Sequence, residues 1–507
     1  MMQTTELDTK KHSRKVRFLR IALFACVIAT LGLFLGTAVA RVFFPYGLNY
    51  AEGPLMGQAE RILTGLPLYS TTLDEPSCMV ANYPPLYPSL IAGARAVTRL
   101  SPLPIGRVMS LLAALVSGLI IGLLATHLCG SRLSGLLAMA LFLGHPFTVL
   151  WSSMARVDLL ALALSLVALY LLYRRWQSWF WLAVAVLCLV ASIYTRQTYA
   201  LAVPLAGAIW LWYNDRRRAL VFALVLALSC LFVFLFLDLA TRGGFYLNIV
   251  VANVNRYRVS QVLSVGVLLL LFSPFVLVIG GAEIVQTLKK RPAASERQAS
   301  DAGRSPFVLY GLLPYTVGAF LSALTVGKIG SDVNYFLELV VALTIWAAGA
   351  LVWQPRRGTI SQQALLVLML CQLVWAPVLA RPVQADVVAR WRNLAAYDGL
   401  FQQVKEATAH GPVLADEHME MVVLAGQRIY LQPFECQQLQ ADGLWDPAPL
   451  LQEITTQKFP LIQISDPGSV WFQERWSESM VAAIEEHYEG VEYLPGLVIY
   501  RPQGEAR

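Results

Sequence analysis

The chain has 507 residues, of which 57% are hydrophobic and only 14% are charged. An average soluble domain carries about 25% charged residues, so this composition excludes an ordinary soluble enzyme and indicates many membrane-spanning helices. The charge is also divided unevenly, because residues 1–380 carry a net charge of +16 and residues 381–507 carry −9. We therefore expect two physical environments, a basic membrane part and an acidic region outside the bilayer.

The first expected span covers residues 18–40 and follows a cluster of basic residues from Lys10 to Arg20. Its apolar run is too long for the hydrophobic region of a signal peptide, and the residues after it form a poor cleavage site. We therefore expect residues 1–17 to be a basic cytoplasmic N-terminus that precedes a retained span.

About eleven apolar runs of the length that a spanning helix needs lie within residues 18–380. They cover residues 18–40, 105–128, 133–151, 157–173, 178–195, 198–213, 218–238, 262–285, 306–325, 334–353 and 363–380. The hinges between them alternate between many and few basic residues, and the richer set is expected to be cytoplasmic. The sequence thus predicts a polytopic α-helical protein of the cell membrane, with the N-terminus in the cytoplasm and loop 41–104 outside.

Residues 381–507 differ in kind from the membrane part. The stretches PVLAD, RIYL, FPLIQIS and LVIYRP have the character of short strands. The stretches VVARWRNLAAYDGLFQQVKEAT, DPAPLLQEITTQK and ESMVAAIEEHYEG have the pattern of amphipathic helices. Alternating strands and helices predict a small α/β domain, which the alternation of basic hinges places outside the cytoplasm.

Two amphipathic helices are expected in the outer loop, residues 41–104. Pro54 suits the first position of one helix, and Pro85 precedes the other. A helix with one apolar face beside a span is expected to lie flat at the membrane surface. Glu52 comes directly before the first helix, where free amides and the helix dipole favour its charged form. A plain helix-start acid is the alternative interpretation of this residue.

Several motifs together resemble those of membrane glycosyltransferases of the GT-C class, and within it the family 39 or RgtA/B/C/D-like bacterial branch. They are NYAEGPLMGQAERILTGLPLY, NYPPLYPSL, MARVDLLALALSLVALYLL and GKIGSDVNYFLEL, and the stretch that begins GPVLADEHMEM is similar to the outer domain of one subgroup. In that class the first outer loop carries an acidic residue, often in an Asp-Glu or Asp-Asp pair, at the reaction centre. By position this residue corresponds to Glu52, but Ala51 precedes it here instead of a second acid.

The resemblance implies transfer of a sugar, of the hexosyl or pentosyl type and with inversion, from a polyprenyl-phosphate-linked donor to a glycan, lipid or protein acceptor of the envelope. A phosphate leaves without being protonated if positive charge meets it, so the reaction needs one general base and several cations. Glu52 is the candidate base. No dense metal-ligand motif is present, and a divalent metal stays an open question. No nucleic-acid partner is expected.

Five outer cations are candidates for binding the donor phosphate, since arginine meets phosphate bidentately and lysine acts as a point charge. They are Arg156, Arg196, Arg256, Arg258 and Lys328. Structural alternatives exist for each: Arg156 can pair with Asp158, for example, and Arg196 can extend its charge to the membrane interface.

Five further residues are candidates for contact with the substrates. They are Tyr50, Tyr83, Tyr87, Asp158 and Asp332. The tyrosines can instead belong to the aromatic belt of the membrane interface, and Asp332 can be the N-cap of the next helix. Glu338 lies one turn into that span, where an acid is either functional or the structural partner of a cation such as Arg156.

Two functions of other classes compete with this interpretation. A transporter or flippase of lipid-linked sugars would explain the spans and the outer basic residues. A non-catalytic scaffold of envelope assembly would use the α/β region for interaction. The transporter would not explain the large outer loop and the acidic outer domain.

Overall fold

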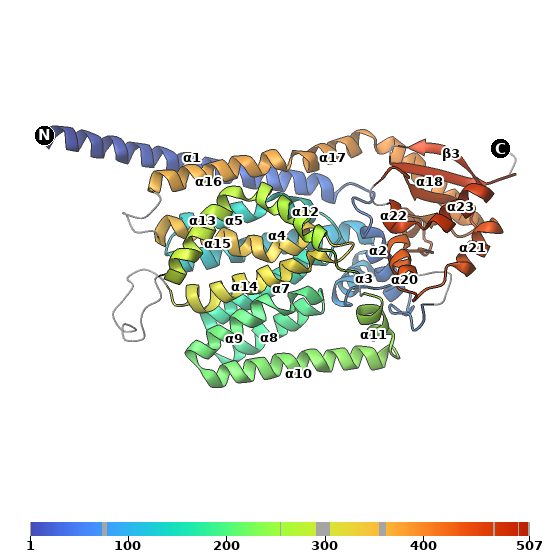
Figure 1. Cartoon of the computed structure of the whole chain (residues 1–507), viewed down its shortest axis with the longest axis horizontal. Coiled ribbons are helices and arrows are strands. Elements are labelled where there is room, and N and C mark those ends of the chain that lie inside the picture. The colour runs from blue at the N-terminus through green and yellow to red at the C-terminus, as the bar shows by residue number, and fades with distance from the viewer. Residues whose placement is uncertain are drawn as a thin grey trace.

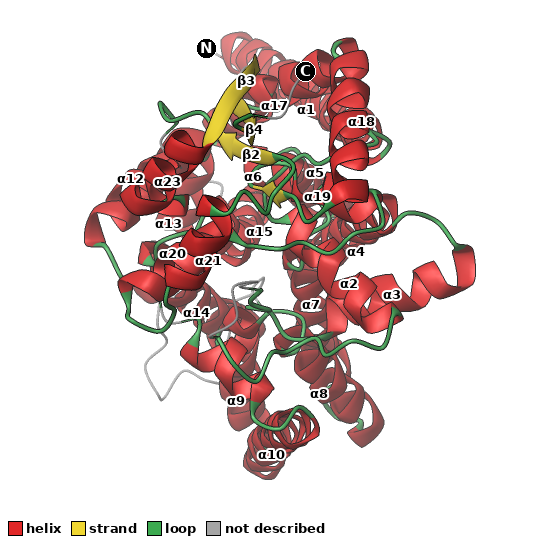
Figure 2. Ribbon diagram, turned by 90° about the vertical axis from the view of Figure 1, so that its right-hand side faces the viewer, coloured by secondary structure: helices red, strands yellow, loops and turns green. Residues whose placement is uncertain are grey.

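The computed structural model describes residues 2–73, 79–253, 255–289, 305–353, 361–469, 472–494 and 496–504. Long helices run roughly side by side through most of the molecule, and the strands gather at the end opposite the N-terminus (Figure 1). Seen from that end, β2, β3 and β4 lie together beside α23 (Figure 2). The membrane part and the C-terminal part, residues 381–504, therefore meet at one end of the helical bundle.

Helices account for every apolar run that the sequence contains. The longer ones are α1 (Met2–Val42), α4 (Pro102–Cys129), α5 (Arg132–Leu143), α7 (Asp158–Arg175), α8 (Trp179–Ile193), α9 (Ala202–Asn214), α10 (Arg216–Ala240), α12 (Val259–Phe272), α13 (Pro274–Lys289), α14 (Leu313–Ala323), α15 (Leu337–Trp353) and α16 (Gln362–Leu379). Two of them show how burial follows composition. In residues 333–353, which include α15, 89% of the most apolar 18-residue stretch is buried, as expected for a helix that is apolar on all sides. In α10 the corresponding share is 11%. Accordingly, α10 lies at the edge of the bundle in both views (Figures 1 and 2).

Fewer helices are long enough to span a membrane than the eleven that the sequence predicts. Within the described residues, six helices are long and apolar enough to cross a membrane, and a seventh span results if α12 and α13, bent by 93°, are taken together. Helix α5 has 12 residues and so spans about 18 Å, less than the ~30 Å of a bilayer core. It stops because Gly144, His145 and Pro146 break the run before the short helix α6 (Pro146–Trp151). A multi-pass membrane protein is thus supported, while the count of eleven stays a prediction.

The outer loop forms the two expected helices, α2 (Glu52–Leu63) and α3 (Leu86–Thr98). Helix α2 packs against the C-terminal part very closely. A Cβ atom at Gly53 would come within 2.8 Å of the backbone nitrogen of Glu420, and the backbone N–H of Gly47 donates to the Glu420 Oε1 at 2.9 Å. A side chain at position 53 would therefore push the two parts of the molecule apart.

The C-terminal part contains a four-stranded sheet in the order β1-β2-β4-β3. Its strands are β1 (Leu414–Ala415), β2 (Ile462–Ser465), β3 (Tyr488–Leu494) and β4 (Leu497–Pro502), and its helices are α17 (Arg381–Arg392), α18 (Leu394–His410), α19 (Met419–Leu424), α20 (Pro433–Ala441), α21 (Ala448–Thr455), α22 (Phe472–Arg475) and α23 (Glu478–His487). Strands β1 and β2 pair in parallel, and the other pairs are antiparallel.

Three of the four expected strands coincide with β1, β2 and β4, and two details differ. The stretch RIYL, residues 428–431, is irregular rather than a strand, although Ile429 and Leu431 are buried. Strand β3 begins at Tyr488, within a stretch that the sequence assigned to a helix, because pairing with β4 extends the chain beyond the end of α23. Local periodicity did not reveal this pairing, since a hairpin is a contact between two segments.

Candidate functional site

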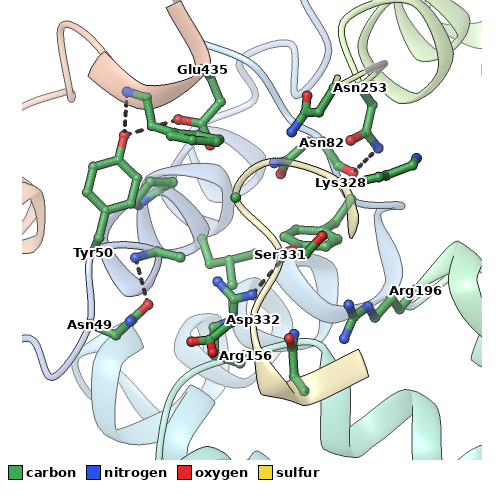
Figure 3. Close-up of a pocket in the computed structure, with 18 of the residues that line it drawn as sticks. Asn49, Tyr50, Asn82, Arg156, Arg196, Asn253, Lys328, Ser331, Asp332 and Glu435 are labelled. Atoms are coloured by element: carbon green, nitrogen blue, oxygen red, sulfur yellow. Dashed lines mark hydrogen bonds between the residues drawn. The ribbon is translucent and has the colours of Figure 1, made fainter. Parts of the chain in front are cut away.

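A cavity of about 270 Å³ lies where the membrane part meets the C-terminal part. Its wall comes from the loop before α2 and from α2 itself, from the turn after α6, from the segment before α9, and from the loop between α14 and α15. The C-terminal part closes it with residues at positions 417, 434, 435 and 475. Figure 3 shows how these side chains surround the open space.

Three of the five candidate cations line this cavity: Arg156, Arg196 and Lys328. Arg156 and Arg196 are 7% and 2% exposed, and both contact the carboxylate of Asp158, Arg156 with its Nε at 3.4 Å and Arg196 through an ion pair. One carboxylate thus faces two guanidinium groups. Lys328 makes no ion pair with any residue that the structure describes. These three side chains consequently form a cationic cluster in the cavity wall, which elsewhere also contains acids.

The two arginines are held by aromatic as well as charged neighbours. The Arg196 guanidinium lies 4.4 Å from the centroid of the Tyr335 ring, and that of Arg156 lies 4.8 Å from the centroid of the Trp151 ring. Within the described residues, the Nε of Arg196 is buried without a hydrogen-bond partner. A buried donor of this kind costs free energy unless a ligand or water accepts from it. The Arg196 Nε is therefore a donor that an anion could satisfy.

Asp158 itself does not line the cavity, and its contact with a substrate stays a prediction. Its side chain is fully buried, and it accepts a hydrogen bond of 2.7 Å from the Asn334 Nδ2 in addition to its two arginine contacts. It lies at the first position of α7, where a carboxylate is favoured by the helix dipole. Asp158 is thus a positioning residue that orients Arg156 and Arg196.

Glu52 lies outside the cavity, and its contacts argue against the prediction that it is the general base. Its carboxylate is fully buried and receives four hydrogen bonds: two from Arg107, at 2.9 and 2.7 Å, and one each from the backbone N–H groups of Leu48 and Ala155, both at 2.7 Å. Burial by itself would raise the pKa of Glu52, but the Arg107 charge and these hydrogen bonds bring the pKa below its usual value. Ala51, not Glu52, lines the cavity.

Arg107, a residue that sequence analysis did not single out, explains this arrangement. It lies within α4, has no exposed surface, and donates to the carbonyl oxygens of Arg41, Phe44 and Tyr46 as well as to Glu52. An arginine in the second turn of an apolar helix is energetically costly without partners, and this was the signal that could have identified it. The Glu52–Arg107 pair joins the end of α1, the outer loop, α4 and the turn before α7.

Arg256 and Arg258 do not line the cavity, and their role in binding the donor phosphate stays a prediction. Both side chains are exposed and approach acids of the C-terminal part: the Arg256 Nε lies 3.3 Å from the Asp442 Oδ1, and the Arg258 Nη1 lies 3.9 Å from the Glu474 Oε1. Their backbone bridges to the segment around Lys328, through an N–H of Arg258 that donates to the Gly327 carbonyl at 2.7 Å. The backbone of residues 256–258, and not their side chains, therefore contacts the loop that carries Lys328.

Two of the three candidate tyrosines line the cavity and one does not. Tyr50 and Tyr83 line the cavity, and the Arg156 Nη2 donates to the Tyr83 hydroxyl at 3.1 Å. Tyr87, in contrast, is fully buried and donates to the Gly106 carbonyl at 2.8 Å, so it packs α3 on α4 instead of facing a substrate. Asp332 lines the cavity and also caps the short helix that follows it, by accepting from the Val333 N–H at 2.6 Å.

Glu338, the acid within the next span, does not line the main cavity. It is 5% exposed and borders a separate space of about 10 Å³ beneath it, beside Arg196 and Asn334. Within the described residues, its Oε1 has no hydrogen-bond partner. If Glu338 is the structural partner of a cation, that cation is therefore Arg196, which borders the same space, and not Arg156.

Four residues of the C-terminal part, which sequence analysis did not single out, also line the cavity: Glu417, Phe434, Glu435 and Arg475. The Tyr50 hydroxyl donates to the Glu435 Oε2 at 3.0 Å, and the Arg475 guanidinium lies 4.3 Å from the centroid of the Tyr50 ring. Burial raises the pKa of Glu435 to about 7. Because these residues are more than 350 positions from Tyr50, no spacing in the sequence brings them together.

No group of three or more His, Cys, Asp or Glu side chains with the geometry of a metal site occurs in the part of the chain that the structure describes.

Comparison with known proteins identifies the fold. No protein-family model and no curated protein matches the sequence. Two solved structures of ArnT from Cupriavidus metallidurans are similar in structure, one bound to undecaprenyl phosphate and one in the apo state, each with a TM-score of 0.61 and 12% sequence identity. The match covers 94% of this chain in both cases, and 98% and 97% of the respective ArnT chains. The chain therefore has the fold of the GT-C class of membrane glycosyltransferases, which confirms the resemblance seen in its motifs.

Proposed function

We propose that this protein is a membrane glycosyltransferase that moves a sugar from a polyprenyl-phosphate-linked donor to an envelope acceptor in the cavity described above. The observation that carries the proposal is the convergence of Arg156, Arg196 and Lys328 on one cavity at the end of the helical bundle. The similar ArnT structure contains undecaprenyl phosphate, a ligand of the same chemical class as the proposed leaving group.

The donor phosphate is proposed to lie against these three cations. The buried Nε of Arg196, which lacks a partner in the described structure, is a donor that a phosphate oxygen would satisfy. Asp158 neutralises only part of the charge of the two arginines, so the cavity favours an incoming anion. In a desolvated site a fixed cation stabilises the negative charge of the leaving phosphate more strongly than it would in water.

In the proposed reaction, a nucleophilic oxygen or nitrogen of the acceptor forms a bond to the anomeric carbon of the sugar. The bond from that carbon to the phosphate oxygen breaks, and its electron pair stays on the polyprenyl phosphate. The acceptor loses one proton to a base of the protein. Attack from the side opposite the phosphate inverts the anomeric configuration, so one base and a set of cations suffice.

The site is proposed to face the outer side of the membrane, with the N-terminus in the cytoplasm. The alternation of basic hinges supports this orientation. Cys436 on α20 is disulfide-bonded, and disulfides persist in oxidising compartments outside the cytoplasm. Tyr50 and Tyr83 at the rim of the cavity, together with Asp332, are proposed to contact the sugar or the acceptor.

Turnover of the purified protein in detergent tests this function against its alternatives. We expect release of polyprenyl phosphate and transfer of labelled sugar from a polyprenyl-phosphate-linked donor to an acceptor extract of the envelope. Mass spectrometry of envelope glycans from cells with and without the gene identifies the sugar. A flippase would move lipid-linked sugar across vesicles without cleaving it, and a scaffold would do neither, so the absence of cleavage with every donor would overturn the proposal.

A further inference from the structure

The proposed reaction requires a proton acceptor. Three acids of the described structure line the cavity: Asp332, Glu417 and Glu435. Glu52, which the outer loop offers by position, is saturated by four hydrogen bonds and turned away. Ala51, which does face the cavity, has no titratable group. The acid that takes the acceptor proton must therefore come from another segment of the chain.

Glu417 and Asp332 are poorly suited to the task. The Glu417 Oε2 is ion-paired with the Arg475 Nη1 at 2.6 Å, so this oxygen is already engaged by a cation of the C-terminal part. Asp332 lies four residues from Lys328 on the loop that presents this cation, and its Oδ1 accepts the Val333 N–H at 2.6 Å. It thus belongs to the side of the cavity where the leaving phosphate is proposed to lie.

Glu435 lies on the other side. Figure 3 shows Glu435 and Tyr50 at one edge of the open space, and Arg196 and Lys328 at the opposite edge. A base that serves inversion has to approach the acceptor on the face of the sugar away from the leaving group. The arrangement of the cavity thus meets a stereochemical requirement of the proposed reaction.

We propose that Glu435, on α20 of the C-terminal part, is the general base of the transfer reaction, and that Tyr50 orients its carboxylate. This inference rests on the proposed function. It makes the C-terminal part a contributor to the catalytic centre rather than an accessory region. The proton of the acceptor hydroxyl or amine passes to a Glu435 oxygen as the new glycosidic bond forms, and the electron pair of the broken bond leaves with the phosphate.

The surroundings of Glu435 are compatible with this role. Burial raises its pKa to about 7, while the Tyr50 hydrogen bond and the positive charges of Arg475 and Arg156 act in the opposite direction. Asp416 and Glu417 share the Arg475 charge, through ion pairs of 2.7 and 2.6 Å. A carboxylate with a pKa near the operating pH is both ionised in part and able to accept a proton effectively.

The decisive variant is Glu435→Gln, compared with Asp332→Asn and with Asp442→Asn, a control at the end of the same helix whose side chain does not line the cavity. We expect Glu435→Gln to lower kcat by about 10² or more while KM for the donor and the affinity for polyprenyl phosphate stay near the wild-type values. Asp442→Asn should leave kcat unchanged. Circular dichroism and thermal unfolding in detergent establish that each variant is folded.

A pH profile provides a second readout. Wild-type kcat should fall as the pH is lowered through about 7, where Glu435 becomes protonated, and the residual rate of Glu435→Gln should lack this limb. Near-normal turnover of folded Glu435→Gln, or loss of turnover only in Asp332→Asn, would overturn the inference while the proposed function stands. Failure of the wild-type protein to cleave any polyprenyl-phosphate-linked sugar would instead overturn the proposed function.

Discussion

Glu52 and Arg107 form a bidentate ion pair with no exposed surface on either side chain, with N–O distances of 2.9 and 2.7 Å. The pair joins the first turn of α2 to the interior of α4, and the backbone N–H groups of Leu48 and Ala155 complete the hydrogen bonding of the carboxylate. A charge that is buried this completely depends on its partner. Its loss should therefore affect the architecture of the outer loop before it affects proton transfer.

Glu52→Gln should destabilise the protein by about 3–5 kcal/mol, because Arg107 would be left buried without a countercharge. Thermal unfolding in detergent, measured beside transfer activity, tests this. We expect activity and stability to decline together. A Glu52→Gln protein that unfolds at the wild-type temperature and yet shows no turnover would restore Glu52 as the candidate base.

Lys328→Met and Arg196→Met should each weaken binding of polyprenyl phosphate about tenfold or more, since a charge-assisted hydrogen bond contributes about 1.5–3 kcal/mol. Arg258→Met is the matched control, because Arg258 carries the same charge near the same loop but does not line the cavity. Affinity is measured for all variants in one detergent and at one salt concentration. Equal affinities for all of them would place the phosphate site elsewhere.

Asp158→Asn should reduce both stability and affinity for polyprenyl phosphate, although Asp158 touches no ligand. Its carboxylate holds Arg156 and Arg196 side by side, and without it the two guanidinium groups repel each other and shift. Asp215→Asn, which removes a surface partner of Arg218, should have little effect on either quantity. Unchanged product affinity in Asp158→Asn would show that the arginines keep their positions without this carboxylate.

The pH dependence of stability should carry a contribution from Glu435. Its pKa is raised from 4.5 to about 7 in the folded protein, so between these values the folded state binds more protons than the unfolded state. The free energy of unfolding therefore decreases as the pH rises from about 4.5 to about 7. Glu435→Gln should show a shallower decrease over this window in thermal unfolding, and an identical slope would mean that the carboxyl is not perturbed.

Reporter fusions test the orientation of the chain. A fusion after residue 357 should report the cytoplasm, because the hinge there is basic, and a fusion after residue 507 should report the outer side. Finding both on one side would change the number of spans between them. It would also remove the argument that the cavity faces outward.

The sequence by itself predicted the membrane character, the positions of the helices and the fold of the GT-C class. These properties follow from features that are local along the chain: apolar runs of spanning length, turn residues between them, and motifs of neighbouring residues. It also located Arg156, Arg196 and Lys328, because each lies at a span end on the side that the basic hinges leave outside. Lys328 and Arg258 looked alike by this criterion, and only packing separated them.

Tertiary structure decided which acid faces the cavity. Adjacent residues at a helix start point about 100° apart, so Ala51 faces the cavity while Glu52 turns to Arg107, a residue 55 positions later. Likewise, Glu435 reaches Tyr50 only because the C-terminal part packs on α2, and Arg256 and Arg258 are drawn away by acids of that same part. Burial and ion pairing are properties of contacts between distant segments. A sequence lists the charges that can form such contacts, but the fold selects the partners.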